Sequence, residues 1–159
     1  MIPQTMTAVE IREPGPPQVL RAVERPVPQP GPGEVLIRVA AAGVNRPDVL
    51  QRKGIYPPPP GITDIPGLEV AGEVVLLGEG VRQPALGERV CALVAGGGYA
   101  QYVSAPAVQC LSVPAPLGLE QAAHFCALPA VTSTRASKAL PSRIAVVPMP
   151  LEPPCTRSV

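Results

Sequence analysis

The sequence EVLIRVAAAGVNRPDVLQRKG, residues 34–54, changes from a strand pattern to a helix pattern within one short stretch. In residues 34–42 the side chains alternate, with Val35, Ile37 and Val39 on one face and Leu36 and Arg38 on the other. Strict alternation is typical of a strand with one face turned to a core. We therefore predict a β-strand over residues 34–42.

Helix signals follow this strand directly. Asn45 can cap a helix, Pro47 falls in the first turn, and Asp48 stands three residues after the cap. A carboxylate at that position satisfies free backbone N–H groups and complements the helix dipole. Gly54 can then adopt the left-handed conformation that ends helices. The spacing predicts a short helix over residues 45–53.

The surrounding sequence predicts a mainly β fold with short helices. Alternating or continuous apolar segments predict further strands over residues 7–12, 69–77, 89–94, 99–104 and 108–113. Glycine, proline and asparagine separate them, and short strands at this spacing favour a barrel or a sandwich. A second short helix is predicted to start near residues 117–120 and to run to residue 123.

Composition divides the chain into two parts. All 15 glycines lie between Gly15 and Gly118, and the remaining segment contains closely spaced prolines. Proline at that density interrupts both helices and central strands. We expect one domain over residues 1–123 and a poorly ordered, proline-rich tail over residues 124–159.

Charge and cysteine spacing exclude several classes of protein. The net charge is +1 without a basic stripe, which does not favour nucleic acid or an anionic membrane as a partner. No apolar run approaches the roughly 20 residues that span a bilayer. The four cysteines are widely spaced and form no C-x-x-C pair, and the N-terminus lacks a signal-peptide pattern. These features favour a cytoplasmic protein with reduced thiols.

Several motifs follow one another in the order of a known protein family. They are GVNRPDVLQRKGIYPPPPG (43–61), IPGLEVAGEV (65–74), GERVCAL (87–93), GGGYAQY (96–102) and LEQAA (119–123). Over residues 5–123 the chain resembles the N-terminal domain of medium-chain dehydrogenases/reductases. It is most similar to their zinc-free NAD(P)H quinone oxidoreductase branch, of the p53-inducible type. The resemblance implies a chaperonin-10 (GroES)-like barrel, in agreement with the strand pattern.

The resemblance also implies an activity, the transfer of a hydride from NADPH to a quinone, and it implies two residues of the active site. Asn45 matches a family asparagine beside the nicotinamide and the substrate, and is therefore a catalytic and cofactor-binding candidate. Tyr56 matches a tyrosine thought to donate to a quinone oxygen or to stack on the ring. Asn45 could instead serve as a helix cap, which is compatible with a site role. Tyr56 could instead pack in its loop.

Zinc is not expected. Zinc alcohol dehydrogenases of the superfamily carry cysteine where this chain has Asn45 and histidine where it has Leu68. Leu68 cannot bind a metal, whereas a catalytic zinc needs about three N, S or O ligands from the protein. We predict no metal ligands, and a zinc alcohol dehydrogenase is the least favoured alternative.

The cofactor-binding half of the family has no counterpart in the sequence pattern. A dinucleotide fold holds the pyrophosphate on a glycine-rich turn, and no glycine follows Gly118. We therefore expect this chain neither to bind NADPH nor to turn over alone, and a frameshift near residue 124 is one hypothesis for the change in composition. The alternative is a non-enzymatic barrel or interaction module, which could associate with a full-length homologue.

Other residues have simpler interpretations. Asp48 is expected to cap the helix, with site polarity as the alternative, and Glu69 to be buried and hydrogen-bonded. Residues 57–60 favour a rigid loop beside the cleft over a polyproline ligand. Residues 96–98 favour a turn over a phosphate-binding loop because an alternating strand follows them. Cys91 is expected to be a small core residue, as is Cys110.

Overall fold

The computed structural model describes residues 1–123 and 146–148. Its elements are β1 (Thr5–Ile11), a 3-10 turn (Pro17–Val19), β2 (Leu20–Pro26), β3 (Glu34–Gly43), α1 (Arg46–Arg52), β4 (Glu69–Leu77), β5 (Arg89–Leu93), β6 (Tyr102–Pro106), a 3-10 turn (Ala107–Gln109), β7 (Cys110–Ser112), α2 (Leu119–Ala122) and β8 (Val146–Pro148). The prediction of a mainly β fold with short helices is confirmed.

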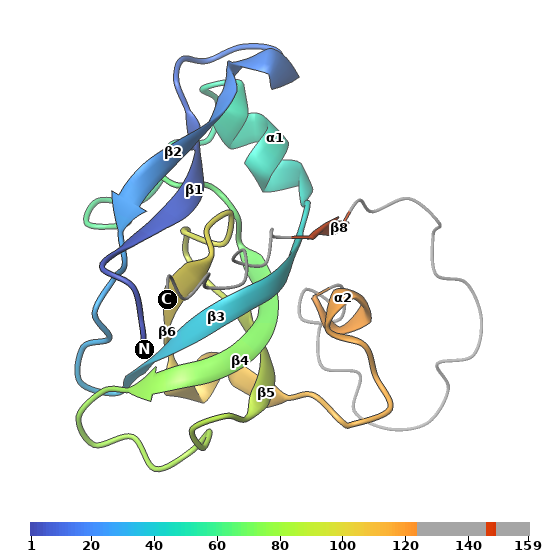
Figure 1. The fold of residues 1–159 in the computed structure, drawn as a ribbon. Helices are drawn as coiled ribbons and strands as arrows, with labels where there is room; N and C mark the ends of the chain where they lie inside the picture. Colours follow the sequence, from blue (N-terminus) through green and yellow to red (C-terminus); the bar gives the residue numbers. More distant parts are fainter. Residues whose placement is uncertain (124–145, 149–159) are drawn as a thin grey trace, which may run out of the picture.

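Two antiparallel sheets make up the domain (Figure 1). The β1–β2 ribbon forms one sheet, and the second has the order β6-β3-β4-β5-β7, with β8 also paired to β3. The sheets are joined where Ala8 bridges Ala100 and where the Val9 N–H donates to the Tyr99 carbonyl over 2.8 Å. The helix α2 packs on β3, β4 and β5 at one side of the barrel.

The strand β3 contributes to three core clusters because both its faces are covered. Val35, Ile37 and Val39 belong to the main core cluster, as the alternation predicts. Leu36, on the opposite face, packs with Met6 and other residues under the β1–β2 ribbon. Burial on both faces makes β3 the central structural element, and β3 leads directly into the candidate site.

One strand of residues 1–123 was not predicted, and several predicted strands have other bounds in the structure, by one or two residues at β1, β3, β5 and β7 and by more at β6. The strand β2 was not predicted, since its side chains are mostly exposed and do not alternate in polarity. β6 begins at Tyr102 rather than at residue 99, because Ala100 forms only an isolated bridge. β7 covers only Cys110–Ser112, since a 3-10 turn precedes it.

The expected disorder of residues 124–159 lies outside the described residues, apart from β8. This strand pairs with the end of β3, with Val147 opposite Ala42, and it ends at Pro148. The sequence pattern did not predict a strand there. Within the described part of the chain, no helix is long and apolar enough to cross a membrane.

Candidate active site

The candidate site forms where the end of β3 meets the start of β4. Ala42 pairs with Val70 across the two strands, so Gly43 comes to lie beside Glu69. A Cβ atom on Gly43 would lie 2.6 Å from Glu69 Oε2 and 2.9 Å from the carbonyl oxygen of Ala123. Real contacts are longer than this, so a residue without a side chain is needed for the close approach.

Asn45 is held at this junction by Glu69. Asn45 occupies the N-cap of α1, and its Nδ2 donates to Glu69 Oε2 over 3.1 Å. Glu69 is only 1% exposed, which confirms its predicted burial and hydrogen bonding. An amide nitrogen carries two hydrogens, so one donor of Asn45 remains after the bond to Glu69. The amide can therefore be fixed in place and still bind an acceptor on a ligand.

Asp48 caps α1, as the sequence predicts. Its Oδ2 accepts a hydrogen bond from the Asn45 N–H over 2.6 Å. The side chain is 5% exposed, and Oδ1 has no hydrogen-bond partner among the described residues. Burial raises the pKa of Asp48, and the N–H of Asn45 is the largest contribution in the opposite direction.

Tyr99 is a member of this cluster that the sequence analysis did not identify. Its hydroxyl donates to the Gly43 carbonyl over 3.5 Å and lies beside Asp48. Burial, followed by the charge of Asp48, raises the pKa of Tyr99 far above its ordinary value. The backbone of Gly67, with φ of +101°, packs so closely that a Cβ there would lie 2.5 Å from Tyr99 N. Tyr99 follows three glycines and belongs to the GGGYAQY motif (96–102), and these are the sequence signals that could have pointed to it.

We expect Asp48→Asn to reverse a pH-dependent cost of folding. The pKa of Asp48 is higher in the folded chain than in the unfolded chain, so protonation of Asp48 favours folding. This contribution to stability is complete below the unfolded-state pKa and is lost as the pH rises through the folded-state pKa. The stability of the variant relative to the original chain should therefore increase between pH 3.5 and pH 7. Thermal unfolding at the two pH values measures this difference.

Two further variants control for general charge and for the helix cap. The exposed Glu24→Gln should show no comparable increase between the same pH values. Asp48→Ala removes the cap and should cost about 1 kcal/mol of stability. A constant difference between Asp48→Asn and the original chain across the pH range would show that burial of the carboxylate does not oppose folding.

Tyr56 lies apart from the cluster around Asn45. It follows the other end of α1 and is 47% exposed. A seven-residue helix is about 10 Å long, and the structure records no hydrogen bond between Tyr56 and Asn45. Among the described residues the phenol has no hydrogen-bond partner. Both side chains are thus available to a ligand, but the structure does not bring them into contact.

The described residues provide no evident site for a metal or a pyrophosphate. They contain no group of three or more His, Cys, Asp or Glu side chains that could hold a metal ion. The glycines at 96–98 lie in a loop that no helix follows, and the N–H groups of Gly97 and Gly98 donate to the carbonyls of Ile65 and Gly67. A Cβ on Gly98 would lie 2.8 Å from the Gly67 carbonyl, and one on Gly96 would lie 3.1 Å from Ile62. Because the N–H groups of Gly97 and Gly98 are already bonded to protein carbonyls, this loop does not offer them to a pyrophosphate.

Comparisons with known proteins identify the domain. The family model "Alcohol dehydrogenase GroES-like domain" matches residues 31–115. The human synaptic vesicle membrane protein VAT-1 homolog is 38% identical over 60% of this chain and 24% of its own length. A probable quinone oxidoreductase of Schizosaccharomyces pombe is 36% identical over 78% of this chain and 38% of its own length.

A solved structure shows the same arrangement. The human VAT-1 homolog-like protein superimposes with a TM-score of 0.71 at 34% identity, over 76% of this chain and 39% of that one. The chain thus spans about a quarter to two fifths of the length of the relatives it matches. The expected GroES-like fold is confirmed, and the chain belongs to the alcohol dehydrogenase GroES-like domain family, with quinone oxidoreductases among its relatives.

Proposed function

We propose that residues 1–123 form the quinone-binding half of a zinc-free NADPH:quinone oxidoreductase. The observation that carries this proposal is the amide of Asn45, held by the buried carboxylate of Glu69 with a second N–H still available. Quinone oxidoreductases among the relatives of the chain support the substrate class. Cys91 and Cys110 are present as thiols and not as a disulfide, which is compatible with a reducing, cytoplasmic location.

Reduction of a quinone is favoured by hydrogen-bond donors placed at the two quinone oxygens. Reduction of a quinone places negative charge on these oxygens, and fixed N–H and O–H donors stabilise that charge. Asn45 and Tyr56 can supply one donor each, and the Tyr56 ring can also stack on the quinone. The quinone is already electrophilic, so the reaction does not require a zinc ion.

Residues 1–123 do not offer a binding site for NADPH in this proposal. In the three-glycine loop the N–H groups of Gly97 and Gly98 are bonded to protein carbonyls, and residues 119–159 contain no glycine. Most of the binding energy for the dinucleotide would have to come from a glycine-rich turn and the fold around it. We therefore propose that the 159-residue chain binds a quinone but neither binds NADPH nor reduces a quinone by itself.

Binding experiments with the purified chain test both parts of this proposal. Duroquinone is a suitable probe, because its ring carries a methyl group at every position where a protein thiol could otherwise add. Ligand-observed NMR should show saturable duroquinone binding that Asn45→Ala weakens at least tenfold. Tyr56→Phe and Tyr56→Ala separate the loss of the hydroxyl from the loss of the ring. The exposed Val108→Ala should leave binding unchanged.

The cofactor is tested separately. NADPH fluorescence should show no binding into the millimolar range, and the rate of duroquinone reduction should equal the rate without protein. Micromolar NADPH binding would contradict the proposal for the cofactor. Absence of saturable duroquinone binding would contradict the proposal for the substrate.

A second function is favoured by the surface beside α1. Val49, Ile55 and Tyr56 are exposed apolar or aromatic side chains on α1 and directly after it, and Ile55 is 67% exposed. Exposed apolar groups close together are typical of a contact surface. If the duroquinone experiment fails, we propose an interaction module that associates with a full-length homologue. Co-purification that Ile55→Ser abolishes would support that alternative.

A further inference from the structure

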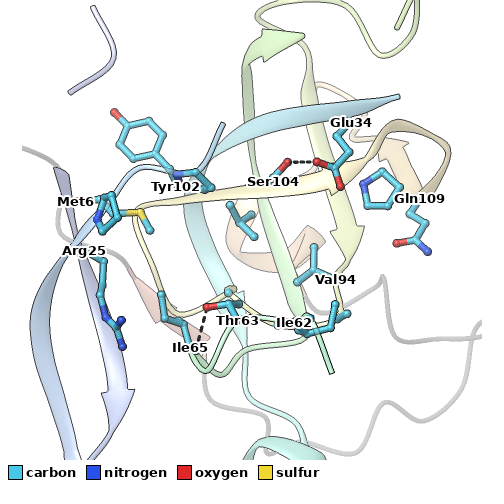
Figure 2. Close-up of a pocket in the computed structure, with 18 residues that line it drawn as sticks. Met6, Arg25, Glu34, Ile62, Thr63, Ile65, Val94, Tyr102, Ser104 and Gln109 are labelled. Carbon is cyan, nitrogen blue, oxygen red and sulfur yellow. Dashed lines mark hydrogen bonds between the residues drawn. The ribbon is translucent and has the colours of Figure 1, made fainter. Parts of the chain in front are cut away.

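A cavity of about 480 Å³ opens in the barrel away from the residues of the candidate active site. Loops 61–65 and 94–97 line it together with parts of β2 and β6 (Figure 2). Neither Asn45 nor Tyr56 lines it. Cavities of roughly 300–1,000 Å³ with apolar walls and a few polar groups are typical of small-molecule sites.

The walls of this cavity are mainly hydrocarbon. Met6, Ile62, Ile65, Val94 and Val103 contribute apolar side chains from four different segments. Several of them are anchored in the cores of the barrel, so the shape of the cavity is set by the fold. A ligand with an apolar body would gain the free energy of removing that body from water.

One end of the cavity presents acceptors. Glu34 Oε2 accepts hydrogen bonds from the Gly31 N–H over 2.9 Å and from the Ser104 hydroxyl over 2.8 Å. Oε1 accepts none from the described residues, and Glu34 takes part in no ion pair among them. Gln109 lies next to Glu34 at the same end (Figure 2). The Ser104 oxygen donates its proton to Glu34 and can itself accept another hydrogen bond.

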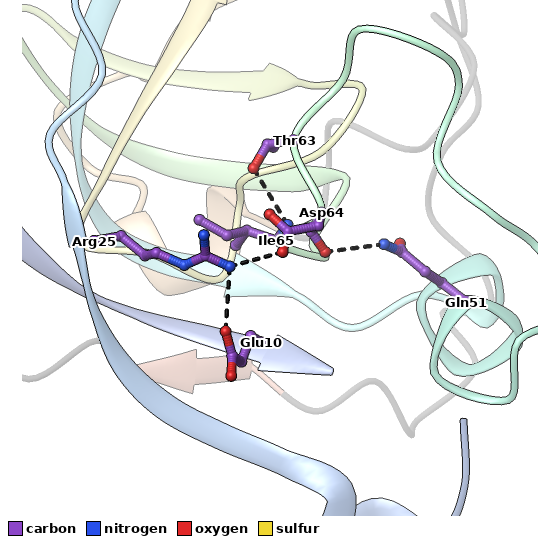
Figure 3. A network of polar contacts seen from close by, with 6 residues as sticks. All are labelled: Glu10, Arg25, Gln51, Thr63, Asp64 and Ile65. Atoms are coloured by element: carbon purple, nitrogen blue, oxygen red, sulfur yellow. Dashed lines mark hydrogen bonds and ion pairs between the residues drawn. The ribbon is translucent and has the colours of Figure 1, made fainter. Parts of the chain in front are cut away.

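The unpaired charge in the described lining of the cavity is negative. Arg25 is the only cationic side chain among the described residues of the lining, and it pairs with Asp64 over 2.7 Å and with Glu10 over 3.2 Å (Figure 3). Asp64 and Glu10 lie outside the lining and offset the charge of Arg25, which leaves the Glu34 carboxylate without an ion-pair partner among the described residues. The Glu34 carboxylate would repel an anionic ligand and attract a cationic one.

We propose that this cavity binds an organic amine. The apolar body of the amine lies on the aliphatic walls, and its ammonium group donates to Glu34 Oε1. An ammonium has three donors and no acceptor, which matches an end formed by Glu34, the Ser104 oxygen and the Gln109 amide oxygen. This site is separate from the proposed quinone site, so the two can be tested independently.

Three probes with the same body distinguish the charge of the ligand. They are 4-phenylbutylamine, 4-phenyl-1-butanol and 4-phenylbutanoate, titrated into the full chain by calorimetry at pH 7. We expect saturable binding of the amine, at least tenfold weaker binding of the alcohol, and no binding of the carboxylate. Equal affinity for the amine and the alcohol, or tighter binding of the carboxylate, would overturn the proposal.

Variants then locate the ammonium. Glu34→Gln keeps the size of the side chain and an oxygen acceptor for Ser104, and should weaken amine binding at least tenfold while leaving alcohol binding unchanged. The exposed Glu79→Gln, on a neighbouring turn, should leave amine binding unchanged. Amine affinity that survives Glu34→Gln overturns the proposal.

A second variant covers the case in which Glu34→Gln does not fold. Ile62 is partly exposed in its loop, so Ile62→Trp should fill the cavity with little effect on the core. Thermal unfolding identifies which variants are folded. Ile62→Trp should abolish amine binding, and unchanged binding in this variant also overturns the proposal.

Discussion

Gly72→Ala is expected to cost about 3 kcal/mol of folding free energy, because overpacking at a rigid site costs roughly that much. Gly72 lies in the middle of β4, opposite Val39 of β3 and Val90 of β5. A Cβ atom there would lie 2.1 Å from the carbonyl oxygen of Arg38. This neighbour is backbone of a paired strand, so it can move only if the pairing of β3 with β4 is disturbed.

Urea unfolding of the original chain and of Gly72→Ala measures this difference in folding free energy. A domain of this size is stabilised by only about 5–15 kcal/mol, so the loss should shift the unfolding midpoint strongly. The control is Gly118→Ala, where the nearest atom to a new Cβ is Gln121 Oε1 at 3.6 Å. That variant should lose less than about 1 kcal/mol, the range of changes at an N-cap. Equal stability of Gly72→Ala and Gly118→Ala would show that β3 and β4 can move apart to accommodate the new Cβ at Gly72 without a loss of stability.

The strands that carry the core were predictable because their apolar pattern is continuous. The predicted strand over 69–77 coincides with β4, and the strand over 34–42 is one residue shorter than β3. Both run through the main core, where side-chain burial and sequence pattern agree. β2 was not predictable in this way, since it is held by its ladder with β1 rather than by burial of one face.

The candidate site was predictable in its residue types but not in its contacts. The capping role of Asp48 follows from its spacing to Asn45, which is local information. The bond from Asn45 to Glu69 joins residues 24 positions apart and depends on the register of β3 against β4. A strand pattern does not specify which partner residue lies opposite, and a slip of one residue would turn Glu69 to the other face. Tyr99 enters the cluster only through the tertiary packing around Gly67.

Register therefore makes Glu69 the positioning residue of the site. Asn45 lies at the start of a short helix, where side chains have more freedom than in a strand. Glu69 lies in a paired strand and is almost completely buried, so its carboxylate is a fixed point to which the amide is attached. On the proposed function, the geometry of the quinone site depends on this attachment rather than on the helix alone.

Glu69→Ala is expected to lower both stability and quinone binding. Truncation of a fully buried side chain leaves a cavity and removes its hydrogen bonds, at a cost of about 3 kcal/mol. Duroquinone affinity should fall at least tenfold at a temperature where circular dichroism shows a folded protein, because Asn45 loses its anchor. Glu69→Gln retains the side-chain volume and an acceptor for the Asn45 amide, so it should keep most of both properties. If Glu69→Ala binds duroquinone as the original chain does while Asn45→Ala does not, Asn45 needs no anchor and the positioning role of Glu69 is wrong.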